Sequence, residues 1–434
     1  MSVTAYLGSI FYLTDDPAVV KAPDCYRYWP DGMLVCKDGM ITAVGPRDEV
    51  EKTLPEAAEI IDHSGSLIIP GFIDTHIHFP QLDMIASFGE QLLDWLERYT
   101  FPEEAKFADP AHAKECADFF LDELLRNGTT TALVYGTVHK QSVDALFEEA
   151  LARNMRLITG KALMDRNVPE AVRDTTAESS DKDNRELIER WHGKGRLGYA
   201  ITPRFAPACS DEQLTLAGKL LREQPEVLMH THLSENVSEI DWVKDLYPTA
   251  KDYLDVYDRF GLLTNQSVFA HCVHLEGQEF QRMAERGAAI SYCPTSNLFL
   301  GSGLFNMKEA EKYGVDVGLG TDVGAGTSFS LLQTMNEAYK VCHLRGHKLD
   351  AFKSFYLATL GGAKVLNMAG KVGSLEVGKE ADFLVLDMHA TPLLSRRLKH
   401  ANTVEETLFV LSMLGDDRTI SHTYVAGVCQ HRKS

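Results

Sequence analysis

Two pairs of histidines, each separated by one residue, lie within apolar segments of this sequence. His76 and His78 belong to PGFIDTHIHF, and His230 and His232 belong to VLMHTHLSE. Residues i and i+2 of a β-strand point to the same face, so each pair can direct two imidazoles toward one metal ion. Spacing alone leaves open whether His230 or His232 is the ligand, and the position of His232 nearer the end of its strand favours it. These pairs predict a metal site at the carboxyl ends of two strands.

Three more residues with acid, base or ligand chemistry follow apolar segments. Glu235 comes after the second histidine pair, His271 lies in FAHC and Asp322 lies in GLGTD. Glu235 could instead be a carboxylate in the first turn of a helix, and Asp322 could cap the segment that follows it. His274 lies past a strand end and is expected to be a loop residue. Imidazole and carboxylate ligands without a thiolate favour zinc, with iron and manganese as alternatives.

These residues need a scaffold that brings several strand ends together. From about Ser66 to Gly370, eight short apolar or β-branched segments alternate with helix-like segments. Eight such units predict an α/β fold, a (β/α)₈ TIM-like barrel, whose active sites lie at the carboxyl ends of the strands. An open doubly wound sheet fits less well, because no glycine-rich phosphate loop follows any segment. The segments are SLIIPGFIDTHIHF, TTTALVYG, MRLITGKALM, LGYAITPRF, VLMHTHLSE, SVFAHCVHL, AAISYCPTSN and VDVGLGTDVG.

Two of the helix-like segments carry clear end signals. One begins at Asp109-Pro110 and runs to Gly128, with proline at the first turn and glycine just past the end. Another begins at Ser210, with Gln213 three residues later in a capping-box pattern. Both segments are therefore expected to be helices between barrel strands.

The two ends of the chain have a different pattern. Residues 1–65 and 371–434 contain short alternating runs such as LVCKDGMITAV and KVGSLEVGKEADFLVLD, with one helical segment near Thr403–Leu414. Chain ends commonly lie close together. We therefore expect both ends to form one small β domain beside the barrel of residues 66–370, with two separate β modules as the alternative.

Composition excludes several classes of protein. The 43 Lys+Arg and 62 Asp+Glu residues give a net charge of −19, which argues against nucleic acid as the main partner. The longest apolar runs fall short of the roughly 18 residues of a membrane span, so no membrane partner is expected. The eight cysteines are scattered without a CxxC pair, as is typical of reduced thiols in a cytoplasmic protein.

Four motifs in this order resemble the amidohydrolase superfamily of metal-dependent hydrolases: PGFIDTHIH, HTHLSE, FAHC and GLGTD. Longer strings resemble its guanine-deaminating members over nearly the whole chain. These strings are HIHFPQ, LLDWLERYTFPEE, RNGTTTALVYGTVH, AITPRFAPACS, SENVSEIDWVKDLYP, CPTSNLFLGSGLFN and LGDDR.

The resemblance implies a role for each candidate residue. One zinc ion per chain would be bound by His76, His78, His232 and Asp322. Asp322 would also act as a base, Glu235 would carry protons, and His271 would hydrogen-bond the metal-bound water. The purine would be held by Gln81, Arg204 and Phe205. A second metal would need a carboxylated lysine, for which Lys161 is the only nearby candidate, so the resemblance implies a mononuclear site.

The implied activity is hydrolysis of guanine to xanthine and ammonia, in purine metabolism, by a cytoplasmic homodimer. One rival is a zinc-dependent deaminase of another heterocycle, such as 8-oxoguanine, a pterin, a pyrimidine or a triazine, because the metal site supports all of these reactions. A non-catalytic scaffold on the same barrel is a second rival. Taken without the resemblance, Arg204 could close a structural ion pair and Phe205 could fill the core. The aromatic segment Phe88–Phe101 is expected to cover a flat substrate.

Overall fold

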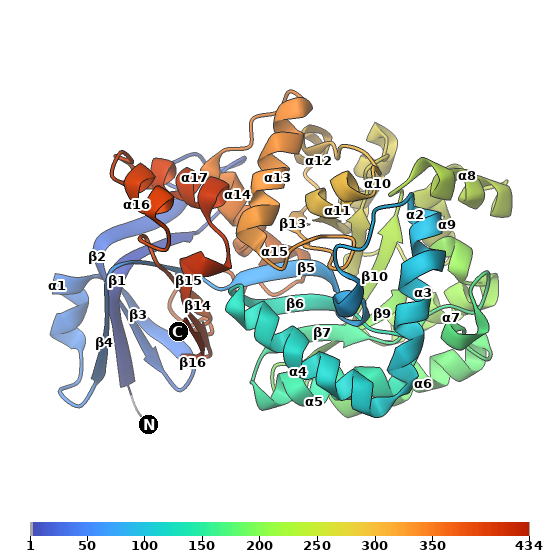
Figure 1. Ribbon diagram of the computed structural model, residues 1–434, viewed down its shortest axis with the longest axis horizontal. Coiled ribbons are helices and arrows are strands. Elements are labelled where there is room, and N and C mark those ends of the chain that lie inside the picture. Colours follow the sequence, from blue (N-terminus) through green and yellow to red (C-terminus); the bar gives the residue numbers. More distant parts are fainter. Residues whose placement is uncertain (1–2, 434) are drawn as a thin grey trace.

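A nearly closed barrel of eight parallel strands dominates the computed structural model, which describes residues 3–433 (Figure 1). The first and last strands are joined where residues just past the last strand pair with the end of the first. Asp322 N donates to His76 O at 2.9 Å, and His78 N donates to Val323 O at 2.8 Å. This confirms the predicted (β/α)₈ architecture. In spatial order the strands are β5 (Phe72–His78), β6 (Thr129–Tyr135), β7 (Arg156–Gly160), β9 (Gly198–Pro203), β10 (Leu228–Leu233), β11 (Ser267–His271), β12 (Ala289–Tyr292) and β13 (Val317–Leu319).

Helices surround the barrel, and a short strand β8 (Ala162–Leu163) pairs with β9. Between the first and fifth barrel strands lie α2 (Leu92–Trp95), a π-helix η3 (Leu96–Thr100), α3 (Phe101–Ala105), α4 (Pro110–Arg126), α5 (Lys140–Ala152), α6 (Ala177–Trp191) and α7 (Asp211–Glu223). The later helices are α8 (Val237–Leu246), α9 (Tyr253–Arg259), α10 (Gly277–Arg286), α11 (Pro294–Phe299), α12 (Met307–Tyr313), α13 (Leu331–Leu344), α14 (Ala351–Leu357) and α15 (Leu360–Val365).

The two predicted helix starts are confirmed, with one difference. Asp109 caps α4 by accepting from Ala111 N, and Ser210 caps α7 by accepting from Gln213 N. The predicted capping box at α7 is only half formed, because the Gln213 side chain donates to Asp174 Oδ2 at 2.9 Å instead of returning to the cap. A buried carboxylate is the stronger acceptor for that amide.

Both ends of the chain meet in one seven-stranded sheet, seen at the left of Figure 1. The C-terminal strand β14 pairs antiparallel with the N-terminal strand β4, so the alternative of two separate modules is wrong. The helix α1 (Arg47–Val50) packs against one edge of this sheet. The helix α17 (Val404–Leu414) lies against the barrel helices α13 and α14, and α16 (Pro392–Leu398) packs against α17. In spatial order its strands are β16 (Val428–Arg432), β15 (Ile420–Val425), β14 (Phe383–Leu386), β4 (Glu59–Pro70), β1 (Val3–Leu13), β2 (Tyr26–Lys37) and β3 (Met40–Pro46).

The predicted first barrel segment is in fact two strands in two sheets. Strand β4 runs across the predicted boundary between residues 65 and 66, and the domain bounds remain a prediction. Gly71 separates β4 from β5, and a Cβ at this glycine would lie 2.1 Å from Thr130 Oγ1. Only glycine therefore allows the backbone to pass from the small sheet into the barrel at this close approach.

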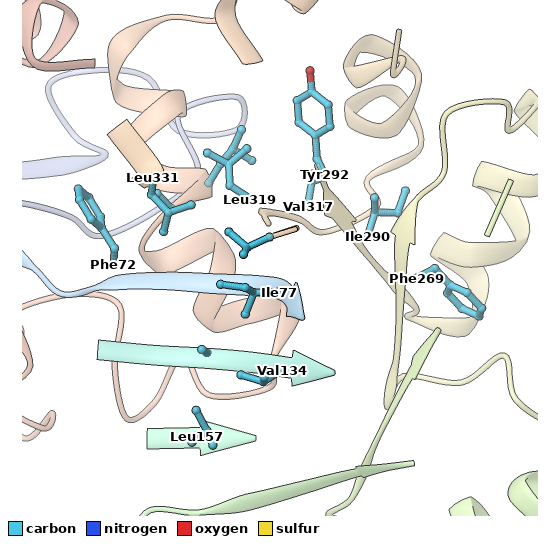
Figure 2. Close-up of a cluster of buried hydrophobic side chains, with 14 of the residues drawn as sticks. Phe72, Ile77, Val134, Leu157, Phe269, Ile290, Tyr292, Val317, Leu319 and Leu331 are labelled. Atoms are coloured by element: carbon cyan, nitrogen blue, oxygen red, sulfur yellow. The ribbon is translucent and has the colours of Figure 1, made fainter. Parts of the chain in front are cut away.

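Two apolar layers hold the barrel strands in place. On the outside, strand residues such as Ile77, Val134 and Leu319 are buried in the cluster that includes the surrounding helices (Figure 2). A second cluster takes one residue from each of seven strands and is completed by residues of and after α15. Its barrel members are Ile73, Leu133, Ile158, Ala200, Leu228, Val268 and Ala289. This packing leaves the carboxyl ends of the strands free to carry polar groups.

The helices and the cysteines of the structure bear on the expectations about membranes and thiols. Among residues 3–433, no helix combines the length and apolar character required to span a bilayer. All eight cysteines are free thiols, and all but Cys429 are buried.

Candidate active site

Four side-chain atoms, from β5, from β10 and from the turn after β13, converge at the carboxyl end of the barrel. Asp322 Oδ1 lies 3.1 Å from His76 Nε2 and 3.2 Å from His78 Nε2. His78 Nε2 lies 3.2 Å from both His76 Nε2 and His232 Nε2. Zinc bonds of about 2.0 Å place the ligands of a tetrahedral site about 3.3 Å apart. The spacing and chemistry of this donor set therefore fit a metal ion.

The neighbouring polar groups orient the imidazoles toward one another. His232 Nδ1 lies 2.6 Å from the carbonyl oxygen of Arg204, which can only accept, so this nitrogen donates and Nε2 carries the lone pair. His230 Nε2 lies 2.6 Å from His76 Nδ1, on the side of the His76 ring away from the cluster. The structure thus resolves the choice left open by spacing: His232 joins the cluster, and His230 supports His76 from behind.

The backbone around the cluster is held in unusual conformations. His271 and Asp322 have positive φ angles of 70° and 53°, which non-glycine residues rarely adopt. Buried Asp74 joins the first and last strands, because its Oδ1 accepts from the backbone N–H groups of His76 and Thr321, both at 3.1 Å. Left-handed residues at strand ends turn the chain sharply, and such strain concentrates at functional sites.

Glu235 and His271 lie beside the metal-fitting cluster. His271 Nε2 is 3.5 Å from Glu235 Oε2 and 3.7 Å from Asp322 Oδ2, and it is buried without a hydrogen-bond partner among the described residues. Its other nitrogen, Nδ1, lies 2.9 Å from Asn297 Oδ1, and Ser302 Oγ donates to Glu235 Oε1 at 3.2 Å. His271 can therefore direct Nε2 at a small polar molecule placed between the two carboxylates.

The two carboxylates of the site have opposite pKa shifts. Burial, with a further contribution from the charge of Asp322, raises the pKa of Glu235 to about 8. Burial also acts to raise the pKa of Asp322, but the charge of His76 and the hydrogen bonds from His76 and His78 outweigh it and hold this pKa well below its usual range. At neutral pH the site thus offers one protonated and one ionised carboxyl, the pairing that acid–base catalysis requires.

A pocket opens beside these groups and is covered by the segment that was expected to close over a substrate. We call this segment, Phe88–Phe101, the lid. The lid residues that line the pocket come from α2 and η3. The apolar side of the pocket is lined by Leu92, Trp95, Leu96, Phe205, Leu300 and Ala325. Phe88 itself is exposed, so Trp95 is the large lid aromatic that faces the pocket.

The residues expected to hold a purine form one edge of the same pocket. Arg204 Nη1 donates to both oxygens of Glu104, at 2.8 and 2.7 Å. Gln81 Nε2 donates to Glu104 Oε1 at 3.3 Å, and Gln81 Oε1 accepts from Gly324 N at 3.2 Å. Phe205 lies beside Arg204 on the pocket wall. Arg204 therefore does both things that the sequence left as alternatives: it closes a buried ion pair and it lines the pocket.

Lys161 is separate from the metal-fitting cluster. Its amine is buried and donates to Asp174 and, at 3.2 Å, to Ser180 Oγ. This ion pair accounts for the buried charge of the lysine. His274, expected in a loop, follows β11 and lies 2.8 Å through Nε2 from the carbonyl oxygen of Ser302.

Comparison with known proteins places the chain in a family. Residues 67–429 match the model of the amidohydrolase family. The chain belongs to this family. It is 52% identical over 429 residues to the guanine deaminase of Escherichia coli K12, a match that covers 98% of this chain and 97% of that protein.

Solved structures of other amidohydrolases superpose on nearly the whole chain. The E. coli guanine deaminase structure matches with a TM-score of 0.96 at 51% identity, covering 99% of this chain and all of that one. A guanine deaminase from C. acetobutylicum, solved with bound guanine in its active site, matches with a TM-score of 0.89 at 32% identity over 99% of this chain and all of that one.

Several residues of this amidohydrolase site were missed by the sequence analysis. Asn236 and Glu239 form the capping box of α8, and Glu239 Oε2 accepts from Glu235 N at 3.0 Å. The cap-x-x-Glu pattern in ENVSE could have revealed them. Glu104 and Asn297 have no such spacing signal. Their roles can be recognised only in the folded barrel, which brings Glu104 next to Arg204 and Asn297 next to His271.

Proposed function

We propose that this amidohydrolase converts guanine and water to xanthine and ammonia. The observation that carries the proposal is the pocket itself, whose lining combines the donors of Arg204, the carboxyl of Glu235 with its raised pKa, and an apolar wall that includes Phe205. The full-length relatives named guanine deaminase, and the related protein that holds guanine in its active site, support the same substrate.

We assign one zinc ion per chain to His76, His78, His232 and Asp322, whose spacing suits tetrahedral zinc. When bound, zinc lowers the pKa of a coordinated water from 15.7 to about 7 and so supplies a nucleophile at neutral pH. Lys161 is already paired with Asp174, which favours a single metal over two.

Two carboxyl groups transfer the protons, and His271 orients the water. Asp322 is ionised and accepts a proton from the attacking water through Oδ2, the oxygen that faces His271. Glu235 is protonated and donates to the ring nitrogen beside the attacked carbon, then carries a second proton to the departing amine. That second proton is the one on the newly added hydroxyl group, which Glu235 takes up after its first donation. The proton held by Asp322 then passes to Glu235, so both residues return to their starting states and the reaction is balanced. His271 Nε2 orients the water by a hydrogen bond.

Recognition of the ring uses the opposite edge of the pocket. Arg204 hydrogen-bonds to Glu104 through Nη1 alone. Among the described residues, its Nε and Nη2 donate to no protein group. These two parallel donors suit a purine carbonyl and the adjacent ring nitrogen. Gln81 offers both a donor and an acceptor, and the ring of Phe205 offers an apolar face.

Ammonia release from guanine, measured on protein whose zinc content is determined in the same sample, tests the proposal. We expect rapid release with about one zinc per chain. A filled metal site with no release from guanine would reject guanine as the substrate. A panel of 8-oxoguanine, pterin, pyrimidine and triazine compounds would then separate the remaining substrates by kcat/KM. In the His76→Ala variant we expect a lower zinc content, and full occupancy would remove His76 from the ligand set.

The proposal also covers the oligomeric state and the cellular location of the protein. A homodimer in the cytoplasm is what the sequence resemblance and the scattered free cysteines suggest. Sedimentation analysis of the zinc-loaded protein tests the dimer, and a monomeric mass at micromolar concentration would contradict it.

A further inference from the structure

Glu104 is a completely buried carboxylate that bridges the two polar residues of the purine edge. It lies on α3, directly after the lid, and has no exposed surface. Both of its oxygens accept from Arg204 Nη1, and Oε1 also accepts from Gln81 Nε2. One side chain therefore connects the end of the lid to both polar residues that face the pocket.

The pairing determines which donors of Arg204 remain available. The guanidinium is held on one corner by Glu104, and its central carbon lies 5.5 Å from the ring centre of Phe101. A guanidinium is planar, so fixing one nitrogen and one face fixes the direction of the remaining N–H groups. Gln81 is fixed in the same way, because Glu104 takes its amide nitrogen while Gly324 N donates to its oxygen.

The pairing also determines the charge of this edge. Arg204 is 3% exposed, and a buried guanidinium without a partner would attract anions strongly. With Glu104 beside it, the pair has no net charge. The other carboxyl groups that line the pocket belong to Glu235, Glu239 and Asp322, and none of them adds positive charge.

We propose that Glu104 is a positioning residue that makes the purine edge a neutral array of directed donors, and so selects an uncharged purine over an anionic one. This inference rests on the proposed function and deepens it. The product of that reaction, xanthine, is a stronger acid than guanine because a carbonyl replaces the amine. An edge without net positive charge holds the neutral substrate by hydrogen bonds and gives no additional attraction to the ionised product.

Binding of two purines to the zinc-loaded protein tests this role. Hypoxanthine and xanthine are the probes, titrated calorimetrically at a mildly alkaline pH where xanthine has lost a proton and hypoxanthine has not. In the Glu104→Gln variant the guanidinium is uncompensated. We expect the affinity for xanthine relative to hypoxanthine to rise at least about tenfold over the wild type. The KM for guanine should rise as well, because the amide cannot hold Arg204 and Gln81 as the carboxylate does.

The neighbouring Glu103 provides a matched control. It lies on the same helix and is also buried, but its carboxylate pairs with Lys106 at 2.6 Å and has no contact with Arg204 or Gln81 among the described residues. Glu103→Gln makes the same chemical change one residue away. We expect the xanthine to hypoxanthine ratio of this variant to equal that of the wild type.

Each outcome decides the inference. A Glu104→Gln protein that folds with an unchanged ratio overturns it and leaves Glu104 a structural residue. If this variant does not fold, Glu104→Asp replaces it, because aspartate keeps the charge and shortens the side chain by one methylene. We then expect a higher KM for guanine and an unchanged affinity for xanthine relative to hypoxanthine. A change in this relative affinity overturns the inference. A wild-type protein that releases no ammonia from guanine contradicts the proposed function, whereas a working wild type with an unaffected Glu104→Gln variant contradicts only the role of Glu104.

Discussion

The two halves of the pocket are built in different ways. The metal-fitting half comes from the ends of β5 and β10 and from the turn after β13, and its side chains follow the regular spacing of strands. The purine half comes from the turn after β5, from α3 and from the residues after β9. Its central contact, between Glu104 and Arg204, joins positions 100 residues apart.

This difference separates the chemistry of the site from its specificity. Strands of a barrel are rigid, so the atoms that we propose to hold a metal and to move protons are fixed by the scaffold. Residues on short helices and connecting segments can change without disturbing the barrel, so a barrel of this kind can change its ligand specificity while its strand-end residues stay the same. We therefore expect substitutions in the metal half to affect turnover and metal content, and substitutions in the purine half to affect binding.

The largest effect is expected when the proton carrier Glu235 is replaced. Glu235→Gln keeps the shape of the side chain and its contact with Ser302 but removes its ability to transfer a proton. We expect kcat to fall by about 10²–10⁴-fold, the usual contribution of a general acid. Zinc content and thermal unfolding, measured on the same preparation, should match the wild type. Unchanged turnover would remove Glu235 from the mechanism.

A smaller effect in the same half is expected at His230, which orients His76 without joining the cluster. His230→Ala removes the partner 2.6 Å from His76 Nδ1. Loss of a group that orients a metal ligand typically lowers metal affinity by about 10–100-fold. Competition with a chelator measures this affinity.

His274→Ala is the comparison for that measurement, because His274 follows a neighbouring strand and its imidazole hydrogen-bonds to the carbonyl oxygen of Ser302 rather than to a histidine of the cluster. We expect its zinc affinity to equal that of the wild type. Equal affinities in the two variants would show that His230 does not support the metal site.

The same contrast explains what could be predicted from the sequence. The eight strands and the histidine pairs follow from local periodicity. His232, which was favoured as a ligand because it lies nearer the strand end, is the member of its pair that lies beside His78. Glu104, by contrast, acquires its function only through contact with a residue distant in the sequence. The junction at Gly71 was missed for a related reason: the apolar run is continuous across it, and only the approach of Thr130 reveals two strands.

The pH dependence of the reaction tests whether Glu235 must be protonated. Burial raises the pKa of Glu235 to about 8, so its protonated form predominates below that pH and is lost above it. We expect kcat/KM for guanine to fall about tenfold for each pH unit above about 8, because this ratio reports the free enzyme. In Glu235→Gln the residual activity should lack this fall. Any ionisation of guanine affects both proteins equally, so identical profiles would assign the fall to the substrate.

The smallest effect is expected at Gln91, where the lid meets the catalytic half. Gln91 Oε1 accepts from Asn236 Nδ2 at 3.0 Å, and Gln91 Nε2 donates to the carbonyl oxygen of Leu300 at 3.4 Å. Asn236 follows Glu235 directly, so one side chain ties the lid to the backbone beside the proton carrier. Glu235 and Asp322 are almost fully buried, so we expect the lid to move when a substrate enters or leaves.

Gln91→Ala removes both hydrogen bonds, each worth about 0.5–1.5 kcal/mol. We expect the closed lid to be less stable and KM for guanine to rise about 2–10-fold, measured by steady-state kinetics, with zinc content unchanged. Glu90→Gln is the matched control, because Glu90 pairs with Arg98 inside the lid and does not connect it to the barrel. An equal change of KM in both variants would mean that the lid responds to its own packing rather than to its attachment beside Glu235.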